Sequence, residues 1–359
     1  MGKTTFSSRG PKSHPARIRN HVAAGDLHRA AARAMRALGP DNRSSIGLWG
    51  AVLDELRDLT GRQRRALIRA VADRFGSAGD VLEERGRILA LCCRLAEGAG
   101  DDALAPLAAE RRRALDDLAR LRLTSDIERL HVLVETELAE GRAPAPAVVA
   151  VIRRSALHPA CGEEVRRLAT RLTEPVLNVG EEWAEQALRD ATGPAWRALL
   201  THITTAASAR PTTRWDRQAR ALVDTLGAEH VRETVLPWLT LVGRPRTLPL
   251  KPRVWEPDIN HAYDPCNATA LRGLAGLLSL LPPHPGTVRA LGALAETSLE
   301  PVTGIGPRSP KVATAAVHAL TRTEGDPAHT ELTRLAAVVT HKTTARLVHR
   351  ALQARATAL

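Results

Sequence analysis

Arginines recur at helical spacing within residues 210–220. The four are Arg210, Arg214, Arg217 and Arg220, and Trp215 lies among them. Residues three and four apart share one face of an α-helix, so we expect these guanidinium groups to form a single stripe. Such a stripe can follow a phosphate backbone, with an affinity that falls as salt rises. The alternative interpretation is a solvated helix face with Trp215 packed against neighbouring helices.

A second basic segment, GIGPRSPK at residues 304–311, joins a glycine-containing turn to the start of a predicted helix. Such a turn can present backbone N–H groups to a phosphate, as in the helix-hairpin-helix element of DNA-binding proteins. The two prolines each remove one N–H donor, so the sequence favours a packing turn between helices. If the segment binds phosphate, we expect Arg308 and Lys311 to make the contact through their side chains.

The remaining predicted contacts lie in the C-terminal helix and in a proline-rich loop. The C-terminal helix carries a second basic stripe: Arg346, His349, Arg350 and Arg355. The loop runs over residues 244–267 and contains five prolines, with Trp255 and Tyr263. A loop of this length inside a compact array is either functional or disordered. Its aromatic residues favour function, so we predict that Trp255 and Tyr263 form the rim of a contact surface.

An enzymatic alternative is a DNA glycosylase for alkylated DNA on a HEAT-like scaffold, which holds the damaged base with a tryptophan and a carboxylate. The available pairs are Trp215 with Asp216, and Trp183 with Glu182 or Glu185. Adjacent residues on a helix point about 100° apart, so neither tryptophan converges with its neighbour by sequence alone. We expect no catalytic residue.

Metal and cofactor sites have weaker signals. The proline-rich loop carries four possible ligands: Asp258, His261, Asp264 and Cys266. Their spacing matches no HxxxH, HExxH or paired CxxC pattern, which a zinc site would require. The chain also lacks a GxSxG nucleophile elbow and a GxxxxGK[ST] phosphate loop. We expect neither a metal nor a cofactor.

Composition favours helices and an anionic partner. The chain has 359 residues, of which 44% are hydrophobic and only 3% aromatic, so its core must be built from Leu, Ala and Val. Leu and Ala are strong helix formers, whereas the aromatic residues that strands prefer are scarce. The net charge of +12 indicates attraction to polyanions such as DNA, RNA or an acidic protein. A generically basic surface, set by arginine-rich composition alone, is the alternative.

Cellular location follows from the cysteines and the apolar runs. Cys92, Cys93, Cys161 and Cys266 show no CxxC spacing, which predicts reduced thiols of a cytosolic protein. No signal peptide is visible. The longest apolar run, residues 271–281, is too short to cross a bilayer. We therefore expect a cytoplasmic protein without a membrane partner, and the sequence leaves the oligomeric state open.

Three regions are predicted along the chain. Residues 1–25 read as a flexible basic arm, residues 26–192 as a first helical segment, and residues 193–359 as a second one. Helix starts are marked by capping residues or by proline in the first turn. These starts are Thr60 with Gln63, Ser125 with Glu128, Gly193-Pro194, Asp264-Pro265 and Asp326-Pro327. No run alternates with period two, so we expect an all-α chain without a sheet.

From about Ala195 to Leu359 the chain resembles the helical-repeat region of large bacterial proteins, common in actinomycetes, that also carry a domain of unknown function related to the molybdate-metabolism regulator. The matching segments are WRALLTHITTAASARPTTRWDRQARALVDTLG (196–227), VLPWLTLVGRPRT (235–247), NATALRGLAGLLSLL (267–281) and GIGPRSPKVATAAVHAL (304–320). The resemblance implies a HEAT-like solenoid of antiparallel helix pairs. It supplies no catalytic residues.

These observations predict a non-catalytic binding or scaffold protein that holds a polyanionic or acidic partner against a basic face. The glycosylase is one alternative, which requires a pocket with converging tryptophan and carboxylate. The other is a protein–protein adaptor whose basicity is only compositional, which requires exposed apolar residues in its groove.

Overall fold

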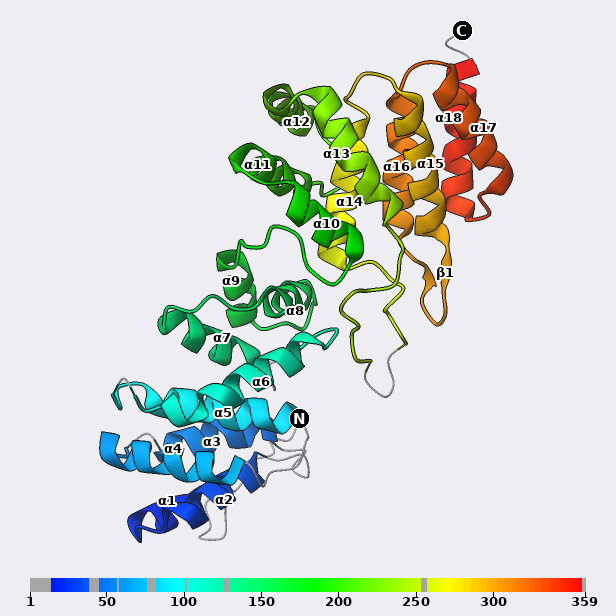
Figure 1. The fold of residues 1–359 in the computed structure, drawn as a ribbon. Helices are drawn as coiled ribbons and strands as arrows, with labels where there is room; N and C mark the ends of the chain where they lie inside the picture. Colours follow the sequence, from blue (N-terminus) through cyan, green and yellow to red (C-terminus); the bar gives the residue numbers. More distant parts are fainter. Residues whose placement is uncertain are drawn as a thin grey trace. The chain divides into compact units, whose positions relative to one another are not determined.

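The computed structural model shows an all-α protein. It describes residues 14–38, 45–56, 58–75, 82–100, 102–124, 129–252 and 257–356. Within these ranges there are 18 α-helices, and the only β-strands are two short ones of two residues each, which pair with each other (Figure 1). The predicted helical class is thus confirmed. The chain divides into two compact units, Met1–Arg171 (unit 1) and Leu172–Leu359 (unit 2).

The described part of unit 1 consists of nine α-helices and one 3₁₀ turn. These are α1 (His14–Ala23), α2 (Leu27–Ala37), α3 (Ser45–Leu56), α4 (Gly61–Phe75), α5 (Leu82–Ala96), η1 (Ala105–Leu107), α6 (Ala108–Ala119), α7 (Leu130–Ala139), α8 (Pro146–Ala156) and α9 (Glu163–Arg171). Helices two apart in the chain pack together: α1 on α3, α3 on α5, α5 on α7 and α7 on α9. Each of these helices therefore buries its apolar face against near neighbours in sequence.

The basic arm ends earlier than predicted. Residues 14–23, which were expected to belong to a flexible arm of 25 residues, form α1. Ile18 and Val22 are four residues apart and therefore share one helix face. Both are buried, and α1 packs on α2 and α3. Residues 1–13 lie outside the described ranges.

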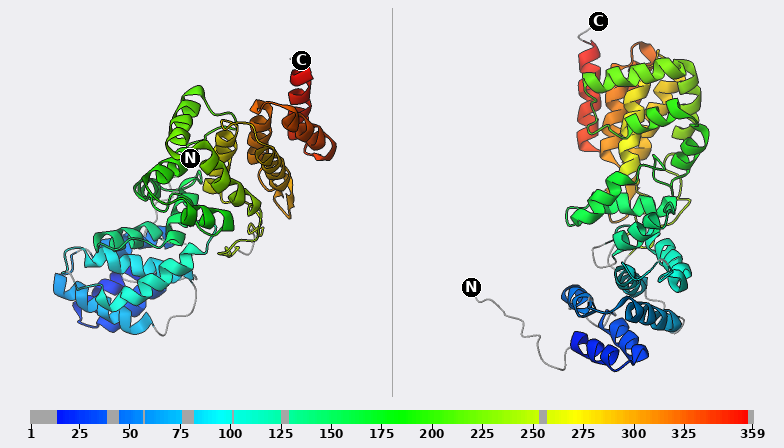
Figure 2. Two further views of the ribbon diagram at one scale, coloured as in Figure 1. Left: turned by 45° about the horizontal axis from the view of Figure 1, so that its top comes forward. Right: turned by 90° about the vertical axis from the view of Figure 1, so that its left-hand side faces the viewer.

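The described part of unit 2 contains the other nine helices and a short hairpin. These are α10 (Glu182–Asp190), α11 (Pro194–Ile203), α12 (Thr213–Leu226), α13 (Ala228–Thr240), α14 (Pro265–Leu278), α15 (Pro285–Leu299), β1 (Pro301–Val302), β2 (Gly306–Pro307), α16 (Pro310–Arg322), α17 (Asp326–Val338) and α18 (Lys342–Ala356). They form two layers. In one layer α12, α14, α16 and α18 pack in succession, and in the other α13, α15 and α17 do so (Figures 1 and 2).

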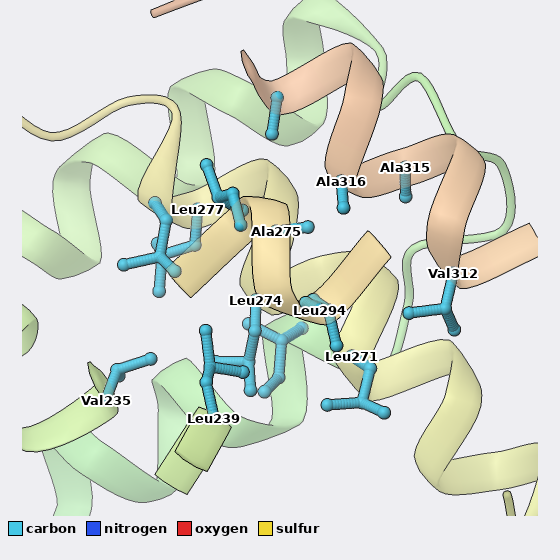
Figure 3. Packing of buried hydrophobic residues seen from close by; sticks show 14 of the residues in the cluster. Val235, Leu239, Leu271, Leu274, Ala275, Leu277, Leu294, Val312, Ala315 and Ala316 are labelled. Atoms are coloured by element: carbon cyan, nitrogen blue, oxygen red, sulfur yellow. The ribbon is translucent and has the colours of Figure 1, made fainter. Parts of the chain in front are cut away.

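Small side chains let neighbouring helices of unit 2 pack closely. Figure 3 shows Val312, Ala315 and Ala316 of α16 facing the side chains of α14. At Gly273 the backbone of α14 lies very close to α11. A Cβ at this position would lie 2.2 Å from the carbonyl oxygen of Ile203. The absence of a side chain at residue 273 therefore sets the position of α14 relative to α11.

Most of the helix starts predicted from capping residues and prolines are confirmed. Thr60 and Gln63 form the predicted capping box, with Gln63 N donating to Thr60 Oγ1 over 3.3 Å and Thr60 N to Gln63 Oε1 over 3.0 Å. Pro194 opens α11, and Asp264 caps α14, where its carboxylate accepts from Cys266 N over 2.9 Å. The proposed cap at residues 125–128 lies outside the described ranges.

The boundary between the units falls before residue 172 and not at residue 193. Leu177 is buried in the apolar core of unit 2. Asn178 N donates to Asn267 Oδ1 over 2.9 Å, and Asn267 lies on α14. These contacts bind residues 172–181 to unit 2, although the breakers in the sequence place the division at Gly193.

Cysteines and membrane-spanning potential complete the description. Cys92 and Cys93 of α5 are buried thiols, and burial raises the pKa of both. Among the helices that the structure describes, none combines the length and apolarity needed to cross a bilayer.

Candidate anion-binding cavity

The arginines of residues 210–220 do not all lie on one helix. Thr212 caps α12, its hydroxyl accepting from Trp215 N over 3.2 Å, so the helix begins at Thr213. Arg210 therefore precedes α12 and cannot share its face, which corrects the predicted four-residue stripe. The three arginines on α12 are exposed, and they are Arg214, Arg217 and Arg220.

Trp215 belongs to the core and not to a binding surface. Its ring is 7% exposed and stacks on His202, with ring centroids 4.4 Å apart. The indole N–H donates to Thr205 Oγ1 over 3.1 Å. The pKa of His202 is lowered, because the effect of burial outweighs that of the hydrogen bond to the carbonyl of Trp215, which acts in the opposite direction. The structure therefore matches the alternative interpretation for this residue, in which Trp215 packs against neighbouring helices.

The GIGPRSPK segment forms the turn and second strand of a hairpin, and the amides of Arg308 and Ser309 that follow are already bonded. Gly304 and Gly306 adopt φ values of 74° and 99°, which only glycine reaches without strain, and β1 pairs with β2. Arg308 N donates to the carbonyl of Glu300 over 2.9 Å, and Ser309 N to that of Ser298 over 2.7 Å. Because these N–H groups bond the end of α15, they do not form a phosphate cradle.

Arg308 and Tyr263 hold this hairpin in place. The Arg308 side chain is 8% exposed, pairs with Glu300 over 2.9 Å and lies over the Tyr263 ring, 5.7 Å from its centroid. The Tyr263 hydroxyl contacts Ser298 Oγ at 3.3 Å, and burial raises the pKa of Tyr263 to about 12. Neither side chain is presented to a partner as predicted. Trp255, the other predicted rim residue, lies outside the described ranges.

Lys311, by contrast, faces a cavity of about 450 Å³ in unit 2, the basic cavity. Its lining comes from the loop after α11, from α14, and from the starts of α16 and α18. The lining residues are Ala207, Ser208, Ala209, Arg272, Pro310, Lys311, Thr314, His341 and Thr343. Every titratable residue among them is basic. Thr343 adds a hydroxyl group, whereas the hydroxyls of Ser208 and Thr314 donate to backbone carbonyls.

Arg272 is the most unusual residue of the basic cavity. Its guanidinium donates to the carbonyl of Ala207 over 3.1 Å and to Thr269 Oγ1 over 3.0 Å. Both acceptors are neutral, and burial lowers the pKa of Arg272. Taking a cation out of water costs free energy unless an anion compensates it. The described contacts of Arg272 supply no carboxylate, so the cavity favours an anion from outside.

Two helix starts add to this positive potential. α18 begins at Lys342, and α16 begins at Pro310. In α16 the contribution comes from the N–H of Lys311, because those of Val312 and Ala313 donate to the carbonyl of Ser309. His341, directly before α18, engages Thr344 Oγ1 through Nδ1 at 2.9 Å. The first N–H groups of a helix lack partners within the helix and carry a partial positive charge, which attracts anions.

The basic cavity continues along one face of α16, where Lys311, Thr314, His318 and Arg322 follow at spacings of three and four. Arg210 Nε lies 3.4 Å from His318 Nδ1, so the loop before α12 reaches this face. Burial lowers the pKa of His318, as do Arg210 and then Arg350. Arg322 pairs with Asp216 over 2.7 Å. The fold therefore brings together Arg210, Lys311 and Arg350, three of the residues predicted from sequence.

The other C-terminal residues have different roles. Arg346 is exposed on α18, as is His349. Arg355 is not part of a binding stripe, because its guanidinium donates to the carbonyl of Leu320 over 2.9 Å and also contacts that of Thr323. It thereby satisfies carbonyl groups at the end of α16 that a helix leaves without partners.

Unit 1 holds a cavity of similar size with the opposite character. Its volume is about 440 Å³, and its lining includes Glu97, Glu135 and Glu140. These carboxylates have basic partners: Glu97 pairs with Arg94 over 2.8 Å and Glu140 with Arg111 over 2.6 Å. Glu135 lies 3.9 Å from Arg171. The carboxylates that line the cavity of unit 1 are thus paired with arginines, whereas the lining of the basic cavity contains no carboxylate.

A buried polar cluster ties the proline-rich loop to α10 and α14, and nothing in the sequence predicted it. Glu181 Oε1 accepts from Asp264 N over 2.6 Å, and Oε2 accepts from Asn267 Nδ2 over 2.8 Å. Arg246 lies 3.7 Å from the same carboxylate. Burial, and then the Asp264 carboxylate, raise the pKa of Glu181 to about 7, whereas Arg246 opposes that shift.

The tryptophan and carboxylate pairs of the glycosylase alternative do not frame a base-sized pocket. Trp183 is 1% exposed and donates to Glu181 Oε2 over 3.1 Å. The cavity that it lines with Glu182 measures about 10 Å³, room for one water molecule. Asp216 of the second pair is bonded to Arg322.

Neither metal ligands nor an apolar groove emerge from the described residues. No three His, Cys, Asp or Glu side chains come together there as a metal site, including those of the proline-rich loop. Among the described residues, the exposed large apolar side chains are Leu157 just after α8, Ile305 in the hairpin and Val338 in α17. They therefore lie in three separate places in the fold.

Sequence reasoning missed Arg272, His318 and His341. Arg272 gave one signal, a single charge inside the apolar run 271–281. The two histidines gave none, because only the packing of α14, α16 and α18 shows what they face. Comparison with protein-family models, curated proteins and solved structures yields no match to the chain.

Proposed function

We propose that the protein is a non-catalytic helical-repeat scaffold that binds the phosphates of nucleic acid through the basic cavity and the adjoining face of α16. The observation that carries this proposal is the convergence of Arg272, Lys311 and His341 on one cavity without a lining carboxylate. Arg210 and Arg350 extend the positive surface beside His318. The net charge of +12 provides long-range attraction for the same ligand.

The architecture within this proposal is a HEAT-like α-solenoid, related to the helical-repeat region that the sequence resembles. In a solenoid each repeat contacts only its neighbours. The succession of α12, α14, α16 and α18 in one layer, and of α13, α15 and α17 in the other, supports this architecture. The basic cavity is lined by the first of these layers, so one face of the array carries the ligand.

Phosphate contacts of this kind are sequence-independent. The lining contains no Trp, Tyr or Phe on which a base could stack. Cationic side chains and hydroxyl groups contact phosphate oxygens, which carry no sequence information directly. The proposal therefore expects DNA and RNA of any sequence to bind.

The test is fluorescence anisotropy of labelled duplex DNA, single-stranded DNA and RNA with the full chain, between about 50 and about 200 mM salt. The affinity should fall steeply with salt, and each lost phosphate contact should lower the logarithmic slope by about 1. Arg210→Ala combined with Lys311→Ala should weaken binding and flatten the slope. Arg189→Ala combined with Arg289→Ala is the matched control, because it also removes two charges, and both arginines are exposed, on α10 and α15, outside the cavity lining.

Two results would overturn the proposal. One is negligible binding of all three nucleic acids at low salt. The other is an equal effect of the cavity variant and the two-charge control, Arg189→Ala with Arg289→Ala, which would show that only total charge matters. Poly-L-glutamate serves as a competitor of peptide chemistry, and displacement as effective as that by DNA would favour an acidic protein as the partner.

A further inference from the structure

We propose that the basic cavity binds the terminal phosphate monoester of a nucleic-acid strand in preference to an internal phosphodiester. This inference rests on the proposed function and specifies its ligand. It follows from three properties of the cavity: the number of converging positive groups, the donors around them, and the size of the site.

Charge is the first property. An internal phosphodiester carries one negative charge, whereas a phosphate monoester carries about −1.5 to −2 at pH 7 because its second pKa is near 6. Arg272 and Lys311 each contribute a positive charge to the lining, and no lining residue is acidic. Two converging cations match a dianion better than they match a monoanion.

Donors are the second property. A phosphate monoester presents three terminal oxygens that accept hydrogen bonds, one more than an internal diester. The guanidinium of Arg272 has five N–H groups, of which two are bonded to Ala207 and Thr269 in the structure. Thr343 brings a hydroxyl group to the same cavity, whereas the hydroxyls of Ser208 and Thr314 donate to the carbonyls of Arg210 and Pro310. The start of α16 adds the backbone N–H of Lys311, since Pro310 has no N–H and those of Val312 and Ala313 donate to the carbonyl of Ser309.

Size is the third property. The lining is drawn from four segments of unit 2, and the volume of about 450 Å³ falls in the range of small-molecule sites. A strand end can enter such a cavity with one phosphate group. Alanine and proline side chains of the loop after α11 and of α16 form the apolar part of the wall.

The experiment compares single-stranded oligonucleotides of one sequence with a 5′-phosphate, a 3′-phosphate or hydroxyl groups at both ends. The full chain should bind at least one phosphorylated form about tenfold more tightly than the hydroxyl form, as expected for charge-assisted hydrogen bonds to the additional charge. Inorganic phosphate at millimolar concentration should reduce this preference. The 5′ and 3′ arms distinguish which strand end the cavity receives.

Lys311→Ala should abolish the preference for the phosphorylated end while retaining part of the general affinity, because Arg210 and Arg350 remain. Lys311 is exposed, so its replacement is compatible with folding, and circular dichroism checks this. Arg289→Ala should keep the preference. Equal binding of phosphorylated and hydroxyl ends by the wild-type chain would overturn the inference and leave the proposed function intact. Failure of every oligonucleotide to bind at low salt would overturn the proposed function itself.

Discussion

At the scale of residues, three arginines of unit 2 show how surroundings decide the use of one side-chain type. Arg308 is buried against Glu300 and Tyr263, and Arg355 bonds the last carbonyl groups of α16. Both are therefore structural. Arg272 has only neutral acceptors and faces a cavity, so its charge is left for a ligand. Sequence cannot separate these roles, because each depends on contacts across helices.

Glu181 gives a prediction at the same scale. Its pKa is raised from 4.5 to about 7, so the folded state binds a proton that the unfolded state releases. The contribution of Glu181 to the free energy of unfolding should therefore be fully present below about pH 4.5 and decline as the pH rises to about 7, by up to about 3 kcal/mol. Urea denaturation followed by tryptophan fluorescence between about pH 5 and pH 8 measures this decline.

Glu181→Gln should flatten that decline, since an amide does not titrate in this range. It should also lower stability near pH 5, because the amide replaces an acceptor of the hydrogen bonds from Asp264 and Asn267. Glu233→Gln, an exposed position of α13, is the control and should leave the pH dependence unchanged. An identical slope for wild type and Glu181→Gln would contradict the assignment.

At the scale of elements, the sequence predicted helix starts correctly where a start depends only on residues within one helical turn. The capping box of Thr60 and Gln63 and the proline at residue 194 placed the starts of α4 and α11, because caps act within one helical turn. The same reasoning misjudged residues 14–23, where only Pro15, Ile18 and Val22 are buried and most other residues are polar. A short apolar pair becomes a helix face only when α2 and α3 cover it.

Gly273→Ala tests the packing of α14. A Cβ would lie 2.2 Å from the carbonyl oxygen of Ile203, so α11 and α14 must move apart. We expect a loss of about 1–3 kcal/mol in the free energy of unfolding, measured by denaturant titration. The control is Gly50→Ala in α3, where nothing lies within 4 Å of the new methyl group. This variant should be neutral or gain up to about 1 kcal/mol from helix propensity. Similar effects of the two variants would refute the close-approach argument.

At the scale of the whole molecule, the chain joins two helical units, and the candidate site lies in the second. Arg210, Lys311 and Arg350 were predicted as separate signals along 140 residues of sequence, and the fold of unit 2 brings them to the surroundings of α16. Composition sufficed to predict the helical class. The cavity itself required the packing of α14, α16 and α18, and no helical periodicity encodes which of their polar residues meet.

Ligand binding should be visible as stabilisation of the full chain. A ligand that binds only the folded state at about 100 times its Kd stabilises it by about 2.7 kcal/mol. An oligonucleotide carrying the preferred terminal phosphate should therefore raise the thermal unfolding midpoint of the wild-type chain in differential scanning calorimetry. The shift should be much smaller for Lys311→Ala at the same concentration. Equal shifts for both chains would indicate binding elsewhere.

The adjacent thiols of Cys92 and Cys93 have a consequence for unit 1. Both sulfurs are buried in α5, and their raised pKa keeps them in the protonated form. Alkylating reagents attack the thiolate, and they must also reach it. Cys93 lines the cavity of unit 1, but Cys92 is fully buried, so reaction at Cys92 requires the surroundings of α5 to open first. In the presence of an alkylating reagent, each such opening can be recorded as an irreversible covalent modification of Cys92.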